Sequence, residues 1–281
     1  MAMEEVVSGP KWVLGGFLFF SVCNQLLRLA VPPTARATAA QSWKWKNTAV
    51  SLVHSLVTGP WSLYCFYEHP KLGEDLINTY TSSSHMLVSF SVGYFIHDFL
   101  DMALWHRKRS SYELMVHHTC VISCFGLAVW STMFVGYAVV ALFVEVNSIF
   151  LHIRQLLNLM GVSKKEPKYR MNSMLNIGTF VVFRIAVLGW MTRWIVLHKD
   201  DLSLPVYTLG SVGLAIIMLM NIILFFRICI VDFSKKKHKD SKGSSLHRKI
   251  LHDDDEVSAG IGSTSVTSTS LLQNGTNLHL S

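Results

Sequence analysis

Seven long apolar blocks constrain the fold of this chain more than any other feature. Each block approaches or exceeds the roughly 20 residues that an α-helix needs to cross the hydrocarbon core of a bilayer. They cover, approximately, residues 12–30, 47–67, 84–104, 112–130, 134–157, 174–197 and 206–230. Only 15% of the 281 residues are charged, against about a quarter in soluble domains. The sequence therefore predicts an all-α, polytopic membrane protein with six to seven transmembrane helices.

Lysine and arginine are distributed unevenly among the connections between these blocks. The basic connections lie near residues 31–46, 105–111 and 158–173, and those that alternate with them hold one basic residue or none. Short loops rich in Lys and Arg stay on the cytosolic side of a membrane. We therefore expect the N-terminus outside the cytosol and the C-terminal tail inside it. The net charge of +7 then reflects topology, and we expect no nucleic-acid partner because no basic helix carries interleaved aromatic residues.

The two ends of the chain need separate interpretation. Residues 12–30 have the length of a signal-peptide core, but Glu4 and Glu5 precede them where a signal peptide carries positive charge. We therefore expect a retained helix. Residues 233–281 are rich in Ser, Thr, Lys and Asp, which predicts a disordered cytosolic tail. Its basic run at 235–239 either contacts anionic lipid headgroups or is simply solvated.

Several polar side chains lie inside the predicted spans, where ionisable groups are costly and usually functional. They are His97, Asp98 and Asp101 in the third block, His117 and His118 in the fourth, Glu145 and Ser148 in the fifth, and Arg184 in the sixth. At a rise of about 1.5 Å per residue, the acidic pair and the histidine pair reach similar depths. We expect these groups to converge on one polar cavity that opens toward the cytosol.

A histidine beside a carboxylate is a typical general base. The carboxylate fixes the tautomer of the ring and raises the basicity of its other nitrogen. We therefore take His117, His118 and Asp98 as candidate catalytic residues that could deprotonate an amine or hydroxyl for attack on an acyl thioester. The other five polar residues, His97, Asp101, Glu145, Ser148 and Arg184, would line a lipid-binding or polar cavity. Metal is the weaker option, because no HExxH or Glu-x-x-His arrangement is present, and we expect no metal site.

The same residues also have a purely structural interpretation. Glu145 and Arg184 could neutralise each other between helices, and Asp101 could pair with Arg107 or Lys108 at the interface. Ser148 and Asn147 could be hydrogen-bonding contacts between helices. Neighbouring histidines point about 100° apart on a helix, so we expect one of the pair to act and the other to orient it.

Five stretches of this sequence carry a family likeness. They are WKWKN at 43–47, VSLVHSLVTGPW at 50–61, GYFIHDFLD at 93–101, ELMVHH at 113–118 and VEVNSIFLHIR at 144–154. Together they resemble the TLC domain family, and the resemblance covers about residues 40–232. It divides the chain into an N-terminal helix and loop (1–39), a TLC domain (40–232) and the tail (233–281).

The resemblance implies an all-helical membrane fold and a link to lipid chemistry. The ceramide synthases of this family N-acylate sphingoid bases with acyl-CoA, and their motif has a histidine pair similar to His117–His118 followed by an aspartate pair in the next helix. This chain has Glu145 there, without such a pair. The role of the histidines is therefore carried over, whereas ceramide synthesis is not.

Resemblance to the small TLC domain-containing proteins implies control of phospholipid acyl composition and membrane fluidity. In that group this means restraining polyunsaturated chains at the plasma membrane, with the endoplasmic reticulum as the alternative location. We expect membrane phospholipids as partners, together with protein partners in lipid remodelling, and no cofactor. One hypothesis is a regulator without turnover, and a second is an acyltransferase with acyl-CoA as co-substrate. A weaker third is a lipid transporter, against which no Gly/Pro-broken helix pair marks a midplane site.

Overall fold

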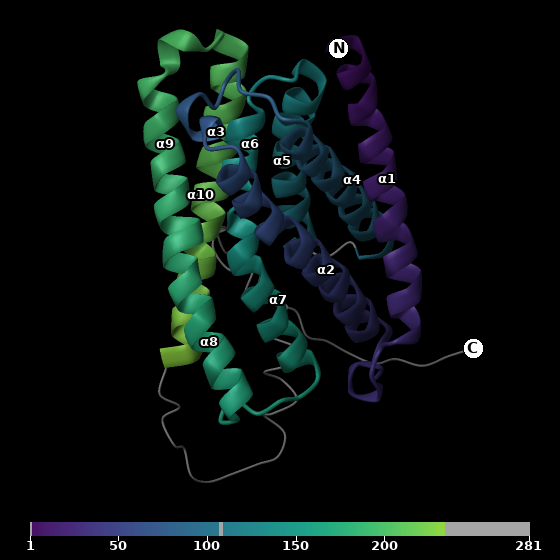
Figure 1. Cartoon of the computed structure of the whole chain (residues 1–281). Helices are drawn as coiled ribbons and strands as arrows, with labels where there is room; N and C mark the ends of the chain where they lie inside the picture. Colours follow the sequence, from purple (N-terminus) through teal and green to yellow (C-terminus); the bar gives the residue numbers. More distant parts are fainter. Residues whose placement is uncertain (1, 107–108, 234–281) are drawn as a thin grey trace, which may run out of the picture. The chain divides into compact units, whose positions relative to one another are not determined.

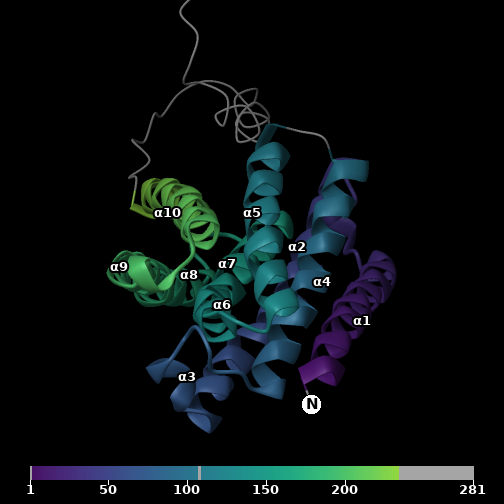
Figure 2. The same ribbon diagram turned by 90° about the horizontal axis from the view of Figure 1, so that it is seen from above.

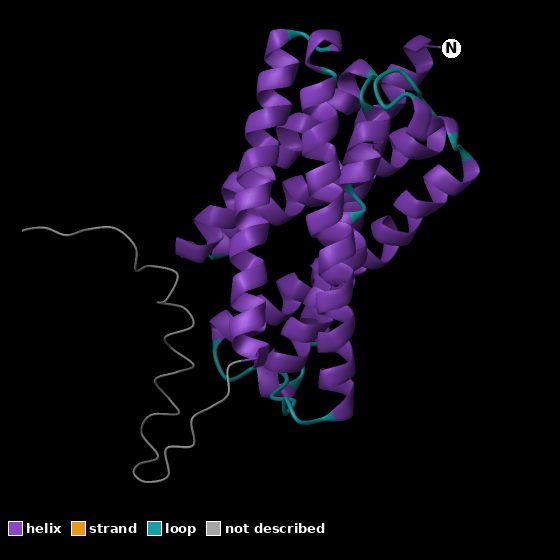
Figure 3. Ribbon diagram, turned by 90° about the vertical axis from the view of Figure 1, so that its left-hand side faces the viewer, coloured by secondary structure: helices purple, strands orange, loops and turns teal. Residues whose placement is uncertain are grey.

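The chain folds into a bundle of helices in the computed structural model, which describes residues 2–106 and 109–233 (Figure 1). No strand occurs among these residues (Figure 3). The α-helices are α1 (Ala2–Leu29), α2 (Ala39–Glu68), α3 (Lys71–Glu74), α4 (Ser82–Trp105), α5 (Arg109–Ser131), α6 (Val135–Ala141), α7 (Val144–Leu159), α8 (Pro167–Phe180), α9 (Val187–Leu197) and α10 (Leu204–Phe233). The predicted tail lies outside the described residues, apart from Phe233 at its start.

Local sequence signals explain where several helices begin. The Thr38 hydroxyl accepts a hydrogen bond from the Gln41 amide at the start of α2, and Thr81 does the same for the Ser84 amide at the start of α4. Such side chains satisfy amides that have no partner in the first helical turn. Pro167 opens α8, where its missing N–H costs nothing.

Six helical segments are long and apolar enough to cross a membrane, so the protein is a multi-pass membrane protein. These segments are Ser8–Leu29, Ser82–Trp105, Ser111–Ser131, Val135–Leu159, Pro167–Leu197 and Leu204–Asp232. The remaining predicted block, 47–67, lies in α2, a 30-residue helix with many polar side chains. Those polar groups face the bundle interior, and the buried ones include Thr48, Ser51, His54, Ser55, Thr58 and Ser62.

Two apolar blocks are less regular than the sequence predicts. The fifth is divided into α6 and α7 at Leu142 and Phe143. The Leu142 amide is shared between carbonyls three and four residues back, and the Phe143 amide bonds to the carbonyl three residues back. The sixth contains a π-helical segment, Val181–Ala186, between α8 and α9. Glu145 follows the first irregularity and Arg184 lies within the second. Helical irregularities of this kind are frequent at functional sites.

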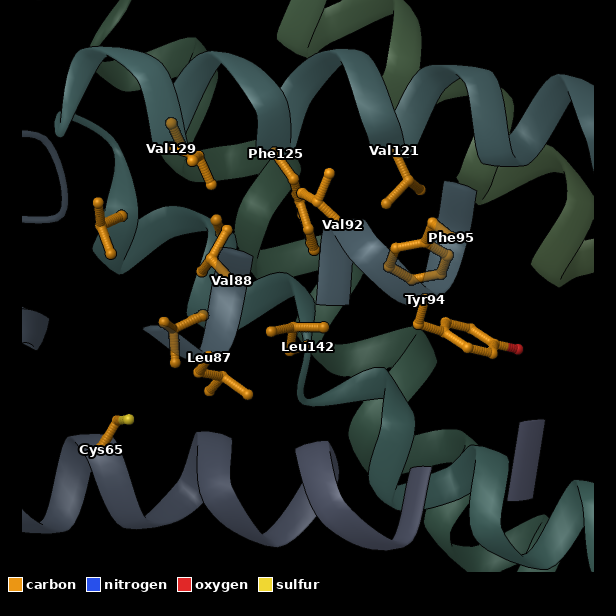
Figure 4. Close-up of a cluster of buried hydrophobic side chains, with 14 of the residues drawn as sticks. Cys65, Leu87, Val88, Val92, Tyr94, Phe95, Val121, Phe125, Val129 and Leu142 are labelled. Atoms are coloured by element: carbon orange, nitrogen blue, oxygen red, sulfur yellow. The ribbon is translucent and has the colours of Figure 1, made fainter. Parts of the chain in front are cut away.

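Helix α4 packs against α1, α2, α5 and α6 and is the most buried of the candidate spans. Looking down the bundle, α1 and α4 lie on one side and α9 and α10 on the other (Figure 2). Figure 4 shows the apolar side chains of α4 that meet α5, among them Val88 and Val92 beside Phe125 and Val129. Close approach elsewhere depends on small residues, since a Cβ at Gly59 of α2 would lie 3.1 Å from the Val146 nitrogen of α7.

The two ends of the bundle are built differently. The connections 30–38 and 160–166 lie at one end (Figure 1). At the opposite end, the segment 69–81, which includes α3, covers the bundle with the buried side chains of Leu72 and Leu76. The Phe134 amide donates to the Ile77 carbonyl at 2.7 Å. These contacts fix the segment against the start of α6.

Candidate functional site

Asp98 and His118 form a buried pair between α4 and α5. The Nε2 atom of His118 lies 3.0 Å from Oδ2 of Asp98. The Nδ1 atom of His118 lies 2.7 Å from the Leu114 carbonyl oxygen, one turn earlier in α5. Because a carbonyl only accepts hydrogen bonds, Nδ1 carries a proton, and both ring nitrogens face oxygen atoms. His118 is therefore held in place by its neighbours, with no nitrogen open to a ligand.

Two asparagines on other helices hold the carboxylates of α4. The side-chain amide of Asn47 donates to Asp98 at 2.5 Å and to Asp101 at 3.5 Å, and that of Asn24 donates to Asp101 at 3.4 Å. The ammonium of Lys46 lies 3.9 Å from Asp101. The predicted alternative partners of Asp101 at 107 and 108 lie outside the described residues. Asn24, Lys46 and Asn47 were not among the predicted site residues, although the last two lie in the WKWKN stretch.

The histidines that flank this pair differ in surroundings. His117 is half-buried and lines a cavity, with its ring centroid 5.5 Å from that of His118. No residue in the described part of the chain donates to or accepts from its ring nitrogens. His97 is buried against α1, where it meets the edge of Phe17 at 6.0 Å. His117 is thus the predicted histidine that a ligand can reach.

Glu145 is held by α2 and does not pair with Arg184. The Ser55 hydroxyl donates to its carboxylate at 2.6 Å, and His54 Nδ1 lies 3.7 Å from the same oxygen. The His54 ring stacks on Tyr94, with centroids 3.9 Å apart. No ion pair joins Glu145 to Arg184 within the described residues, so the predicted direct neutralisation is corrected. The backbone approach at Gly59 explains this, because it brings α2 within reach of the first turn of α7.

Arg184 instead binds neutral oxygen atoms. Its guanidinium donates to Asn147 Oδ1 at 2.7 Å, to Asn221 Oδ1 at 2.6 Å and to Ser148 Oγ at 2.7 Å. Ser148 therefore makes the predicted contact between helices, and its partner is Arg184. Asn147 makes the contact between helices that was predicted for it. Asn221 was not predicted, because a lone amide in α10 carries no spacing signal.

A cavity of about 130 Å³ lies between α5, α6, α9 and α10. His117, in the second turn of its span, and Glu145, near the middle of its own, line one end of it, and Phe134 and Leu202 line it toward the opposite end of the bundle. The walls between are mainly apolar: Val121, Phe125, Ala138, Leu188, Met191, Leu214 and Ile217. The eight predicted residues therefore do not converge on one polar cavity. Two of them, His117 and Glu145, line an apolar cavity, five others belong to hydrogen-bonded groups beside it, and His97 packs against Phe17.

This arrangement accommodates a hydrocarbon chain better than a polar solute. Apolar walls offer no partners for water or ions, whereas His117 and Glu145 at one end offer acid–base groups. No cluster of three His, Cys, Asp or Glu side chains that could hold a metal ion occurs in residues 2–106 and 109–233. The chemistry that the described site offers is thus proton transfer and hydrogen bonding next to an apolar chain.

Comparison with known proteins identifies the family. The TLC domain model matches residues 44–230. TLC domain-containing protein 2 of Danio rerio is 54% identical over 218 residues, covering 77% of this chain and 87% of the relative. The human TLC domain-containing proteins 1 and 2 are 34% and 36% identical, covering 81% and 77% of this chain and 94% and 82% of their own lengths. The chain belongs to the TLC domain family, and its function is accordingly a lipid-related one in a membrane.

Proposed function

We propose that this protein regulates the acyl composition of membrane phospholipids, limiting polyunsaturated chains, by binding a lipid acyl chain in the cavity. The observation that carries the proposal is an apolar cavity inside a membrane bundle with His117 and Glu145 at one end. A polar end beside apolar walls matches the two parts of a lipid. Family membership supports the same class of ligand.

Selection among acyl chains follows from the walls of the cavity. Bulky side chains from separate helices fix its width, among them Phe125 of α5, Tyr137 of α6 and Trp194 of α9. A chain with several cis double bonds carries several fixed bends, whereas a saturated or monounsaturated chain can straighten. The cavity would therefore favour the straighter chains. We place this activity at the plasma membrane, with membrane phospholipids as its ligands.

One observation favours a second candidate, an acyl-CoA-dependent acyltransferase. His117 faces the cavity while His118, beside it, is fixed by Asp98. His117 would take a proton from an amine or hydroxyl as that group attacks the thioester carbonyl. The new C–N or C–O bond forms, the C–S bond breaks, and the CoA thiolate leaves with the proton. In this candidate His117 is the base, and Asp98 and His118 position it.

The phospholipid composition of null cells rescued with variants separates these candidates. The Gly213→Phe variant fills the cavity, since a Cβ there would lie 3.4 Å from Cys124 Sγ. This variant should fail to restore the phospholipid composition under either candidate function. The His117→Ala variant should abolish rescue only if the protein is an acyltransferase. Gly189→Phe on α9, where no atom lies within 4 Å of a Cβ, and His69→Ala in the 69–81 segment are the matched controls.

Each variant must first be shown to reach the same membrane at the same level as the wild type. Full rescue by Gly213→Phe contradicts both candidates, because neither can work with an occupied cavity. If His117→Ala fails to rescue, the purified protein is then assayed for acyl transfer from acyl-CoA to lysophospholipids and amines. Absence of transfer with every donor excludes the acyltransferase.

A further inference from the structure

The cavity is walled mainly by α5, α6, α9 and α10. An acyl chain that enters it from the bilayer has to pass between two of these helices. The interfaces around the cavity are α5–α6, α6–α9, α9–α10 and α5–α10, and they differ in the contacts that would break as the helices part. The interface with the weakest contacts is the natural entrance.

Helix α6 is held on both of its sides. The short turn that joins α5 to α6 is fixed by the Phe134 amide, which donates to the Ile77 carbonyl at 2.7 Å. On the other side of α6, the Tyr137 hydroxyl donates to the Met191 carbonyl of α9 at 3.2 Å. Leu76 of the covering segment belongs to the same buried cluster as Met191. Parting α6 from either neighbour would therefore pull on a short connection or break a hydrogen bond.

Helix α9 is held to α10 by a short connection, by close packing and by a hydrogen bond. Residues 198–203 join the two helices directly. A Cβ at Gly210 of α10 would lie 2.8 Å from Ile195 Cδ1 of α9, so the two helices approach closely beside the cavity. Arg184, in the π-helical segment that leads into α9, donates to Asn221 Oδ1 of α10 at 2.6 Å. This interface is therefore closed as well.

The interface between α5 and α10 has only weak contacts. Its side chains are small, since a Cβ at Gly213 of α10 would lie 3.9 Å from Cys120 Cβ and 3.4 Å from Cys124 Sγ of α5. The one polar contact across it among the described residues joins the Cys124 thiol, a weak donor, to the Leu209 carbonyl at 4.0 Å. Cys124, Leu209 and Gly213 all line the cavity.

The outer sides of these two helices are largely uncovered. Only 28% of the most apolar stretch of α5 and 17% of that of α10 are buried inside the bundle. Val212, next to Gly213, is 53% exposed. In a membrane such surfaces face lipid tails, so this thin interface separates the cavity from the bilayer.

We infer that α5 and α10 part to form a lateral entrance, through which an acyl chain of a bilayer lipid reaches the cavity. Parting them exchanges contacts between small side chains for contacts with lipid tails, which are equally apolar. Parting the other pairs would strain a short connection or leave a hydrogen-bonding group without its partner. The inference rests on the proposed function, because it needs an acyl chain as the occupant of the cavity. It adds the route of that chain and its source, the bilayer.

A disulfide across this interface tests the inference. Gly213→Cys can pair with the native Cys120, because the 3.9 Å between the two Cβ positions lies in the range of about 3.5–4.5 Å found in disulfides. The variant also carries Cys124→Ala, so that α5 offers one partner. The full-length protein is oxidised or kept reduced in detergent and then placed in nanodiscs of phosphatidylcholine whose acyl chain bears a diazirine. Illumination followed by mass spectrometry of the peptides reports which residues the chain contacts.

The reduced variant should be labelled at Leu188 and Met191 on the cavity wall, as the wild type is. The oxidised variant should lose this labelling and regain it after addition of a reductant, because the bond prevents α5 and α10 from parting. Labelling of Leu219 and Ile222, which are exposed on α10, should be the same in both forms. The reduced form is the matched control, since it has the same side chains in the cavity and lacks only the bond.

A further Cys120→Ala substitution should make the labelling insensitive to oxidation. A second lock, Gly213→Cys with Cys120→Ala alone, pairs with Cys124 and should reproduce the loss. Cavity labelling that is equal in the oxidised and reduced forms of both locks overturns the inference, because the chain then enters elsewhere. Absence of cavity labelling in the wild type would instead contradict the proposed function, so the two failures are distinguishable.

Discussion

Helices α4 and α10 show how differently two spans of one bundle are built. In the most apolar stretch of α4, 67% of the residues are buried, against 17% in that of α10. Yet α10 is the more apolar of the two. Helix α4 carries buried His85, His97, Asp98 and Asp101, whereas α10 exposes Leu219, Ile222 and Phe226 toward lipid.

The difference shows that polar side chains of this protein gather in the interior, beside its apolar core, whereas the most apolar span is largely exposed. Lipid tails are as apolar as leucine, so burying leucine gains little in a membrane. Small residues and satisfied hydrogen bonds hold the interior together instead. Helix α2 follows the same rule, since its buried polar residues, such as Ser55 and Thr58, face α7 or neighbouring helices.

The glycines of the two helices provide the strongest test of this comparison. A Cβ at Gly93 of α4 would overlap the Val13 carbonyl of α1 and lie 2.6 Å from the Phe17 nitrogen, whereas one at Gly213 of α10 would meet the Cys124 sulfur at 3.4 Å. Backbone atoms cannot yield as a side chain can. We expect Gly93→Val to cost about 3 kcal/mol or more and Gly213→Val less than about 1 kcal/mol. Unfolding of the purified protein in mixed micelles measures both, and equal losses would refute the contrast.

Polar contacts provide the next test. Asp98 and His118 lie 3.0 Å apart, and both side chains are buried. A double-mutant cycle with Asp98→Asn and His118→Asn should give a coupling energy of about 1–3 kcal/mol. The Ser211 hydroxyl of α10 has no partner among the described residues, so Ser211→Ala should change the free energy of unfolding by less than about 0.5 kcal/mol. A coupling energy near zero would show that the pair adds no stability to the interior of α4.

A small, pH-dependent effect is expected at Asp75, in the segment 69–81 that leads into α4. Its carboxylate accepts from the amides of Asn78 and Ile77, each at 2.9 Å. The backbone N–H of Asn78, followed by its side-chain amide, lowers the pKa of Asp75 from its ordinary value. The ionised form therefore stabilises the fold at neutral pH, and that contribution disappears as the pH falls below about 4.

Asp75→Asn should accordingly cost less than about 1 kcal/mol at neutral pH, because the group lies close to solvent. The difference between the variant and the wild type should vanish in acid. Unfolding of both proteins at neutral and acidic pH measures this. A difference that grows as the pH falls would mean that the carboxylate is not the stabilising form.

Much of the fold follows from sequence patterns that depend on nearby residues. Block length predicted the six candidate spans, since crossing a bilayer needs about 20 apolar residues in any fold. The motif resemblance predicted the family. The division between α6 and α7 was not predicted, because Leu142 and Phe143 are compatible with a continuous helix and only packing changes their hydrogen bonds.

The candidate site was harder to predict. Sequence spacing did not decide between His117 and His118, and it left a Glu145–Arg184 pair open as an alternative. In the structure His118 faces Asp98, while Glu145 bonds to Ser55, which is 90 residues away in sequence. Contacts between distant helices depend on helix rotation and tilt, which spacing along one helix does not determine.

The amino-acid sequence by itself determined that this is a helical membrane protein of the TLC domain family with ionisable groups inside its spans. These properties depend on composition and on the local order of residues, because each helix in a bilayer must satisfy its own backbone hydrogen bonds. Tertiary structure alone decided which polar groups meet, which of them face the cavity, and that Arg184 donates to neutral oxygen atoms. Each of these results from packing between helices, where a rotation of one helix exchanges one set of partners for another.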